Sequence, residues 1–187
     1  MGKWKLVKSK KIFESKWLTL KNNSYDIGGG NIRDDYYHID RPDYVLIVAE
    51  DNDEKIITIR QYRRGVDEIL YELPAGWIDK NETAVQAAER ELREETGFQG
   101  KGVLLGTLTA QPGFMSMKAH VVFVKIEGKL NLKSPSEDEV IEQFSFGIED
   151  IKQMITSGNI KDMGFISAIS LYLLNSTLSV QISDLNH

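Results

Sequence analysis

The chain has 187 residues, of which 41% are hydrophobic and 27% charged, as in a globular protein of one domain with a small addition. It contains no cysteine, which excludes disulfides, thiolate metal sites and cysteine nucleophiles. The formal net charge of -5 argues against nucleic acid as the main partner, because phosphate backbones recruit basic surfaces. The N-terminal lysines precede no apolar segment of the secretory type, and no apolar run is long enough to span a bilayer, so we expect a cytoplasmic protein without membrane contact.

The first half of the chain is predicted to form strands, because β-branched and aromatic residues cluster there between turn residues. The expected strands are Trp4–Val7, Trp17–Ile27, Ile32–Asp40, Tyr44–Ala49, Lys55–Gln61 and Ile69–Glu72. Residues 1–42 have a strand-turn-strand pattern of their own, and so small a sheet cannot bury a core by itself. We therefore expect an N-terminal β region that packs on the main domain, residues 43–187, or on a second subunit.

One strong amphipathic helix is predicted over residues 82–96. Val85, Ala88 and Leu92 form its apolar stripe, Asn81 is the expected N-cap, and Gly97 is the expected stop. Further strands are expected at Gly102–Thr109, Ala119–Ile126 and Ile141–Phe146, followed by helices at Ile148–Thr156 and Asp162–Asn175. This order predicts an α/β (α+β) sandwich built on a mixed sheet.

The segment from Gly76 to Phe98 resembles the Nudix box, G-x5-E-x7-R-E-U-x-E-E-x-G-U with U apolar, and every specified position is present. Glu82 is the first glutamate of that pattern, and Arg90 opens its second half. The resemblance implies a Nudix-type α/β/α sandwich and an enzyme that cleaves a pyrophosphate with the help of a divalent metal.

Helical spacing places the carboxylates of Glu91, Glu94 and Glu95 in one sector of the helix, since residues at i+3 and i+4 are neighbours. Like charges at this spacing destabilise a helix unless something neutralises them, and a divalent cation does so. Oxygen ligands without cysteine favour Mg²⁺, for which Mn²⁺ could substitute. The alternative is a solvated acidic face paired with Arg90 and Arg93.

The resemblance also implies roles for single residues. Ala75, just before the box glycine, would turn its carbonyl to the metal, and Glu91, Glu94 and Glu95 would be its carboxylate ligands and part of the catalytic centre. In nucleotide-sugar members of the family, an acidic loop that corresponds to residues 136–142 of this chain supplies a glutamate to the metals and the attacking water. Glu139 is the first choice for this glutamate, the catalytic base, with Glu137 and Glu142 next. A solvated charged loop is the alternative.

Three features resemble the ADP-ribose pyrophosphatase branch of the family: the strand with Arg60 and Arg63, the extra N-terminal sheet region, and Pro112 placed fifteen residues after Gly97. This resemblance implies hydrolysis of ADP-ribose to AMP and ribose 5-phosphate by a domain-swapped homodimer.

Arg60, Arg63, Trp17 and Pro112 are the expected substrate-binding residues, because arginine suits phosphate and aromatic rings stack on bases. For the arginines, surface ion pairs are the alternative, and for Trp17 it is a half-buried strand position. The run after Pro112 lacks the acidic residue that branch members commonly carry. A GDP-mannose or dinucleoside polyphosphate hydrolase, or a Nudix-fold nucleotide sensor that binds without cutting, therefore stays open.

Overall fold

The computed structural model describes residues 2–130 and 141–184, with side chains as far as residue 175. These residues form two compact units. The first contains the described residues up to Asp43 together with Thr109–Lys118, and the second contains Tyr44–Leu108 and the described residues from Ala119 onward.

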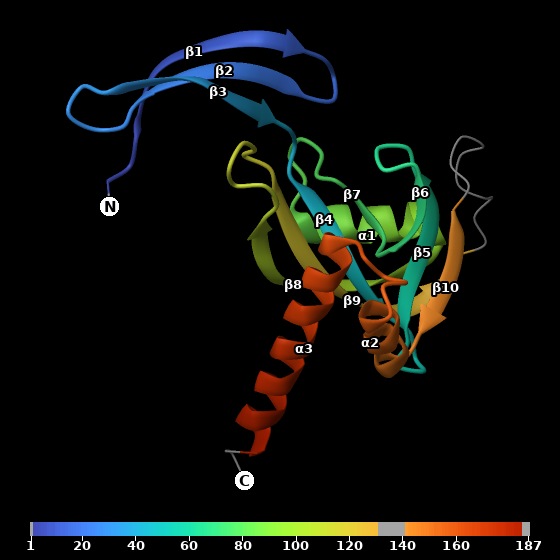
Figure 1. Cartoon of the computed structure of the whole chain (residues 1–187). Helices are drawn as coiled ribbons and strands as arrows, with labels where there is room; N and C mark the ends of the chain where they lie inside the picture. The colour runs from blue at the N-terminus through green and yellow to red at the C-terminus, as the bar shows by residue number, and fades with distance from the viewer. Residues whose placement is uncertain (1, 131–140, 185–187) are drawn as a thin grey trace. The chain divides into compact units, whose positions relative to one another are not determined.

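The first unit is built on an antiparallel sheet in the order β1-β2-β3 (Figure 1). Its strands are β1 (Lys5–Glu14), β2 (Thr19–Asp26) and β3 (Ile32–Asp40). The predicted first strand, Trp4–Val7, was too short, because pairing with β2 continues through two register shifts as far as Glu14. Lysine is tolerated along this strand because all ten of its residues are exposed.

A small cluster of aromatic rings packs within this unit. The ring of Trp4 lies 5.4 Å from that of Tyr36 and 6.3 Å from that of Tyr25, measured between centroids. The segment Thr109–Lys118 joins the same unit through the end of β3, where the N–H of Ile39 donates to the carbonyl of Phe114 at 2.8 Å. The sequence did not predict that this segment would pack with the N-terminal strands.

The second unit contains a seven-stranded mixed sheet in the order β10-β5-β4-β9-β8, with β6 paired to β5 and β7 paired to β4. The β4–β9 pair is parallel, and the β10–β5, β5–β6 and β4–β7 pairs are antiparallel. The strands are β4 (Tyr44–Glu50), β5 (Ile56–Arg63), β6 (Glu68–Glu72), β7 (Ala75–Trp77), β8 (Phe98–Thr109), β9 (Lys118–Lys129) and β10 (Glu142–Phe146).

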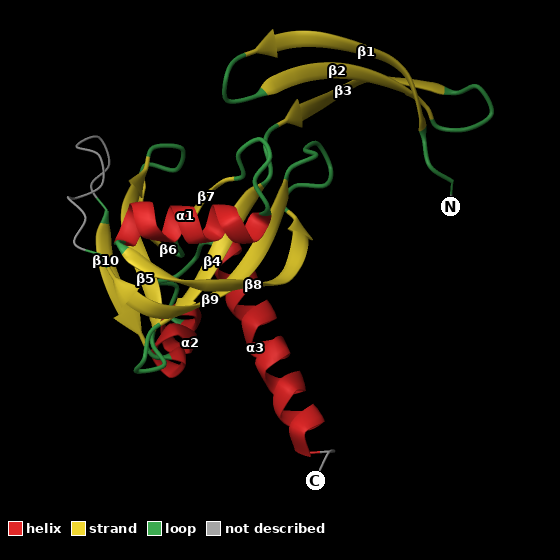
Figure 2. Ribbon diagram, turned by 180° about the vertical axis from the view of Figure 1, so that it is seen from behind, coloured by secondary structure: helices red, strands yellow, loops and turns green. Residues whose placement is uncertain are grey.

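Helices cover both faces of this sheet, as Figures 1 and 2 show. Helix α1 (Ala84–Thr96) packs on one face, and α2 (Ile148–Thr156) with α3 (Met163–Asp184) packs on the other. On the first face Ala88 and Leu92 are fully buried, whereas Val85 of the predicted stripe is partly buried. The arrangement confirms the predicted α/β/α sandwich with a mixed sheet. No helix among the described residues has the length and apolar character needed to cross a membrane.

The N-terminus of α1 differs from the prediction. Asn81 is not the cap: it has a positive φ of 68° and lies in the loop, and Thr83 caps the helix. The hydroxyl of Thr83 accepts from the N–H of Gln86, and the Gln86 side chain accepts in return from the N–H of Thr83, which is a capping box. Glu82 is therefore outside the helix. Gly97 ends the helix in the left-handed conformation, as predicted.

Candidate active site

The box begins at a short strand that the sequence did not predict. Residues Ala75–Trp77 form β7, which pairs with β4 so that Gly76 lies opposite Val45. A Cβ placed on Gly76 would overlap the carboxylate of Glu91. Gly76 is not among the residues with positive φ, so the close approach of Glu91, and not the backbone conformation, is what favours glycine here.

The second carboxylate of the helix meets the same strand. The N–H of Ala75 donates to Oε2 of Glu95 at 3.2 Å. Glu91 and Glu95 are four residues apart, so they lie one above the other on α1, and both reach adjacent residues of β7. Burial raises the pKa of the Glu91 carboxyl above its ordinary value, and the neighbouring Arg90 guanidinium opposes that rise.

Arg90 connects the acidic residues of the box to each other. Its guanidinium donates to both oxygens of Glu82 at 2.9 Å, to the carbonyl of Trp77 at 2.9 Å, to Glu91 at 2.7 Å and to Glu94 at 3.2 Å. Besides its two bonds from Arg90, Glu82 accepts one from the N–H of Asp79. The pKa of the Glu82 carboxyl is lowered chiefly by Arg90. Arg90 therefore organises the site and holds the loop before α1 against the helix.

Glu94 is more exposed than the other two carboxylates, with 56% of its side chain accessible. Within residues 2–130 and 141–184, no three acidic, histidine or cysteine side chains converge as a set of metal ligands. The groups at this place are all oxygen donors, and two of them lie against the same backbone strand. In their chemistry they fit a hard divalent cation.

The two predicted substrate arginines lie on opposite sides of β5. Arg63 is held by Glu72, whose carboxylate accepts from its Nε at 2.9 Å. The side chain of Arg60 packs over the rings of Tyr71 and Phe144, and its Nε donates to Glu142 at 2.6 Å. The structure therefore does not bring Arg60 and Arg63 together. Glu142, one of the alternatives for the base, is engaged by this ion pair.

The other predicted residues lie elsewhere in the chain. Trp17 and Pro112 belong to the first unit, where Trp17 is exposed and carries the ammonium of Lys16 over its ring at 4.5 Å. The hydroxyl of Ser15 accepts from the N–H of Trp17, so this residue stands in a turn before β2 and not in a strand. Glu139 and Glu137 lie outside the described residues.

Sequence reasoning missed Glu72 and Gln61, which are buried beside Arg63. The available signal was the alternation of polar residues at positions 61 and 63 on one strand.

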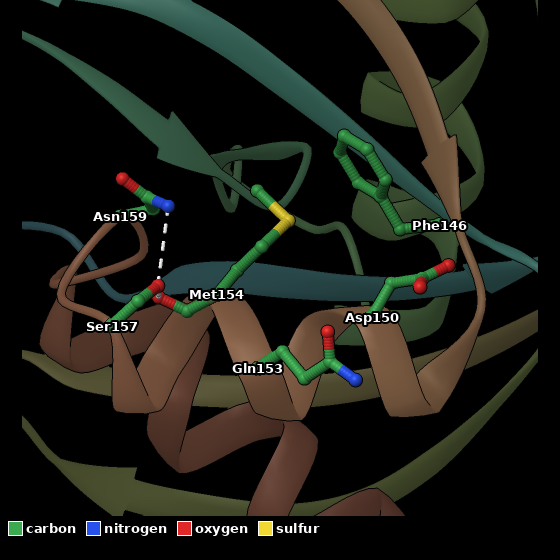
Figure 3. A pocket seen from close by; sticks show the side chains of 6 residues that line it. All are labelled: Phe146, Asp150, Gln153, Met154, Ser157 and Asn159. Atoms are coloured by element: carbon green, nitrogen blue, oxygen red, sulfur yellow. Dashed lines mark hydrogen bonds between the residues drawn. The ribbon is translucent and has the colours of Figure 1, made fainter.

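A depression that none of the box residues lines lies at helix α2. Figure 3 shows its lining, in which Phe146 and Met154 are apolar and Asp150, Gln153 and Asn159 carry the polar groups around them; Ser157 completes it. Its volume is about 490 Å³. All four polar residues are exposed, so it is an open surface hollow and does not take part in the candidate active site.

Comparisons with known proteins agree with this geometry. An ADP-ribose pyrophosphatase of Bacillus subtilis is 28% identical over 181 residues, covering 95% of this chain and 96% of that protein. A methanol dehydrogenase activator of Bacillus methanolicus is 28% identical over 178 residues, covering 93% of this chain and 95% of its own.

Among solved structures, that of an ADP compounds hydrolase matches with a TM-score of 0.82 and 24% identity over 97% of both chains, which shows the shared fold. The model of the NUDIX domain matches residues 40–164, which include the whole box and the β7–α1 contact. The chain belongs to the Nudix family of hydrolases.

Proposed function

We propose that this Nudix hydrolase cleaves the pyrophosphate bond of a nucleoside diphosphate sugar, with ADP-ribose as the favoured substrate. Water adds to one phosphorus atom and the bridging P–O bond breaks, so that ADP-ribose gives AMP and ribose 5-phosphate. The observation that carries the proposal is the convergence of the Glu91 and Glu95 carboxylates on Ala75 and Gly76.

Members of this family generally use divalent metal ions, and the oxygen-only donors here favour Mg²⁺, with Mn²⁺ as a substitute. Glu91, Glu94 and Glu95, with the carbonyl of Ala75, are the residues proposed to hold it. A bound divalent cation would offset the negative charge of the phosphates and lower the pKa of water.

The chain's own residues prepare this site in two ways. The bonds from Arg90 hold Glu91 and Glu94 in place, and the bond from Ala75 N–H holds Glu95. The base proposed to take the proton from water is Glu139, with Glu94, Glu91 and Glu95 around the reacting phosphate. This assignment of Glu139 rests on the family resemblance.

The choice of ADP-ribose is supported by the Bacillus subtilis relative, whose name is that of an ADP-ribose pyrophosphatase and which aligns along almost the whole chain. Arg63 is the stronger phosphate-binding candidate, because its guanidinium is held in one orientation beside the strand that leads to the box. Arg60, Trp17 and Pro112 remain proposed substrate contacts.

We also propose a homodimer formed through residues 1–42. The support is the exposure of large apolar side chains on β1, among them Leu6, Ile12 and Phe13. Large apolar side chains exposed on an edge strand favour pairing with another chain, and β1 is an edge of its sheet.

The proposal is tested by a hydrolysis panel with Mg²⁺, in which AMP, GMP and phosphate are followed after addition of ADP-ribose, ADP-glucose, GDP-mannose and diadenosine polyphosphates. Fast release of AMP from ADP-ribose alone is the expected result. Release of nucleotide from GDP-mannose or a dinucleoside polyphosphate would assign a different substrate while leaving pyrophosphate hydrolysis as the reaction. Binding of all ligands without release would support a nucleotide sensor and refute the enzyme.

A further inference from the structure

Glu72 is a buried carboxylate to which the proposed hydrolysis gives no role beyond the orientation of Arg63. It ends β6, and only 8% of the residue is exposed. Its oxygens accept from Nε2 of Gln61 at 2.9 Å, from Nε of Arg63 at 2.9 Å and from Nη2 of Arg63 at 2.5 Å. Because an ionised carboxylate withdrawn from water must be compensated by such donors, the side chain is held in one orientation.

The donors come from one side of the neighbouring strand. Gln61 and Arg63 are alternate residues of β5 and project from the same face, and Glu72 lies opposite Ile59 in the β5–β6 pairing. Gln61 is itself only 7% exposed. The Glu72 side chain therefore crosses the ladder diagonally and fastens the end of β6 to β5, in addition to the backbone pairing.

Two residues separate this anchor from the active-site strand. Leu73 is buried, and the carbonyl of Pro74 accepts from the N–H of Ile47 on β4 at 2.9 Å. Ala75 then pairs with Leu46, and its N–H donates to Glu95. Glu72 is thus fixed to β5, and Pro74 and Ala75 are fixed to β4. The segment between these two attachments therefore has little conformational freedom.

We infer that Glu72 is a positioning residue, which sets the place of Ala75 and Gly76 and through them the Glu91 and Glu95 carboxylates. It acts through the two connecting residues and touches neither substrate nor metal. This inference rests on the proposed function, because the positioned carboxylates are its metal ligands.

The charge of Glu72 matters as well as its shape. The isosteric change Glu72→Gln would remove the negative charge that pairs with Arg63, and it would turn an N–H₂ group toward Arg63, which can only donate, or toward Nε2 of Gln61, which donates in the orientation observed. Donors would then face each other in a buried place, which costs free energy. The anchor would loosen although the volume of the side chain is unchanged.

The test compares E72Q with the wild type and with a control variant, E68Q. In the wild type Glu68 lies on the same strand as Glu72, is exposed and pairs with Lys161. The dissociation constant of Mn²⁺ is measured without substrate from the electron paramagnetic resonance of free Mn²⁺. Hydrogen exchange of the Ala75 and Gly76 amides is measured on metal-free protein.

For E72Q we expect the Mn²⁺ dissociation constant to rise about 10- to 100-fold, as for other residues that support metal ligands. Exchange at Ala75 and Gly76 is expected to become faster, and E68Q is expected to behave as the wild type in both measurements. Wild-type exchange and wild-type Mn²⁺ affinity in a folded E72Q protein would overturn the inference.

If E72Q does not fold, Gln61→Leu removes one donor and leaves the pair with Arg63. Faster exchange at Ala75 and Gly76 is expected there too, by a smaller factor, and unchanged exchange would overturn the inference. The two proposals fail separately. A wild type that hydrolyses no sugar nucleotide refutes the proposed function, while the exchange comparison still decides the role of Glu72.

Discussion

Glu91 holds its carboxylate directly against the α-carbon of Gly76, where any side chain at position 76 would have to stand. This contact joins the first and second halves of the box, which are fifteen positions apart in the sequence. It explains why glycine is needed at a residue whose backbone conformation other residues could adopt.

Gly76→Ala is expected to move the Glu91 carboxylate and lower the affinity for Mn²⁺ and kcat/KM by about 10- to 100-fold. The unfolding free energy should change little, because the displaced group is the end of a flexible side chain. Thermal unfolding and Mn²⁺ titration measure both effects. Gly65→Ala, at a place with no atom near the added Cβ, is the control. Equal Mn²⁺ affinity in the two variants would contradict the contact's role.

Glu95→Gln is expected to reduce turnover of ADP-ribose by orders of magnitude and leave the fold intact. The amide oxygen can still accept from the N–H of Ala75, but the negative charge available to a metal is lost. Steady-state kinetics at saturating Mg²⁺ and circular dichroism test this. Normal turnover in a folded E95Q protein would refute the metal-site proposal.

Thr83→Ala is expected to lower the unfolding free energy by about 1 kcal/mol, since it removes the N-cap of α1. In a chain of this size the midpoint of thermal unfolding should fall by about 2–4 °C. Asn81→Gly should cost nothing, because Asn81 has a positive φ that glycine adopts freely. A larger loss for N81G than for T83A would show that the helix is capped at Asn81.

Asp162→Asn is expected to stabilise the protein relative to the wild type increasingly as pH rises from about 4 to 7. Burial raises the pKa of Asp162 above its ordinary value, with Glu72 adding to the rise and Arg63 opposing it. A raised carboxyl pKa favours folding while the group is protonated, and this contribution is lost as pH rises through the folded-state pKa.

Asparagine can still accept from the N–H of Phe165, as Asp162 does at 2.6 Å, so helix α3 keeps this bond. Urea unfolding at several pH values gives the two stability profiles. A difference between D162N and wild type that shrinks as pH rises would contradict the direction of the pKa shift.

The wild type is expected to be a dimer of the 21.2 kDa chain in solution, and Ile12→Glu with Phe13→Glu is expected to make it monomeric. Both side chains are exposed on β1, so charge there should disrupt an interface without disturbing a core. Light scattering after gel filtration measures the mass. Ile69→Glu, an exposed residue of β6, serves as the control, and a monomeric wild type would refute the proposed dimer.

The sequence by itself determined the features that depend on local spacing. The complete box placed Glu91, Glu94 and Glu95 on one helix, and Gly97 marked the end of that helix, as the structure confirms. Such features follow from rise and turn per residue, which every helix shares.

Only the tertiary structure decided the contacts between distant segments. Gly76 lies opposite Val45 because β7 pairs with β4, and it lies against Glu91 because α1 packs on β7. No pattern along the chain predicts either contact. The anchoring of Glu72 by Gln61 and Arg63 likewise depends on strand register, because β6 has to pair with β5 so that Glu72 lies opposite Ile59. Register and packing are set by all the side chains that share a core, so they become definite only when the chain folds.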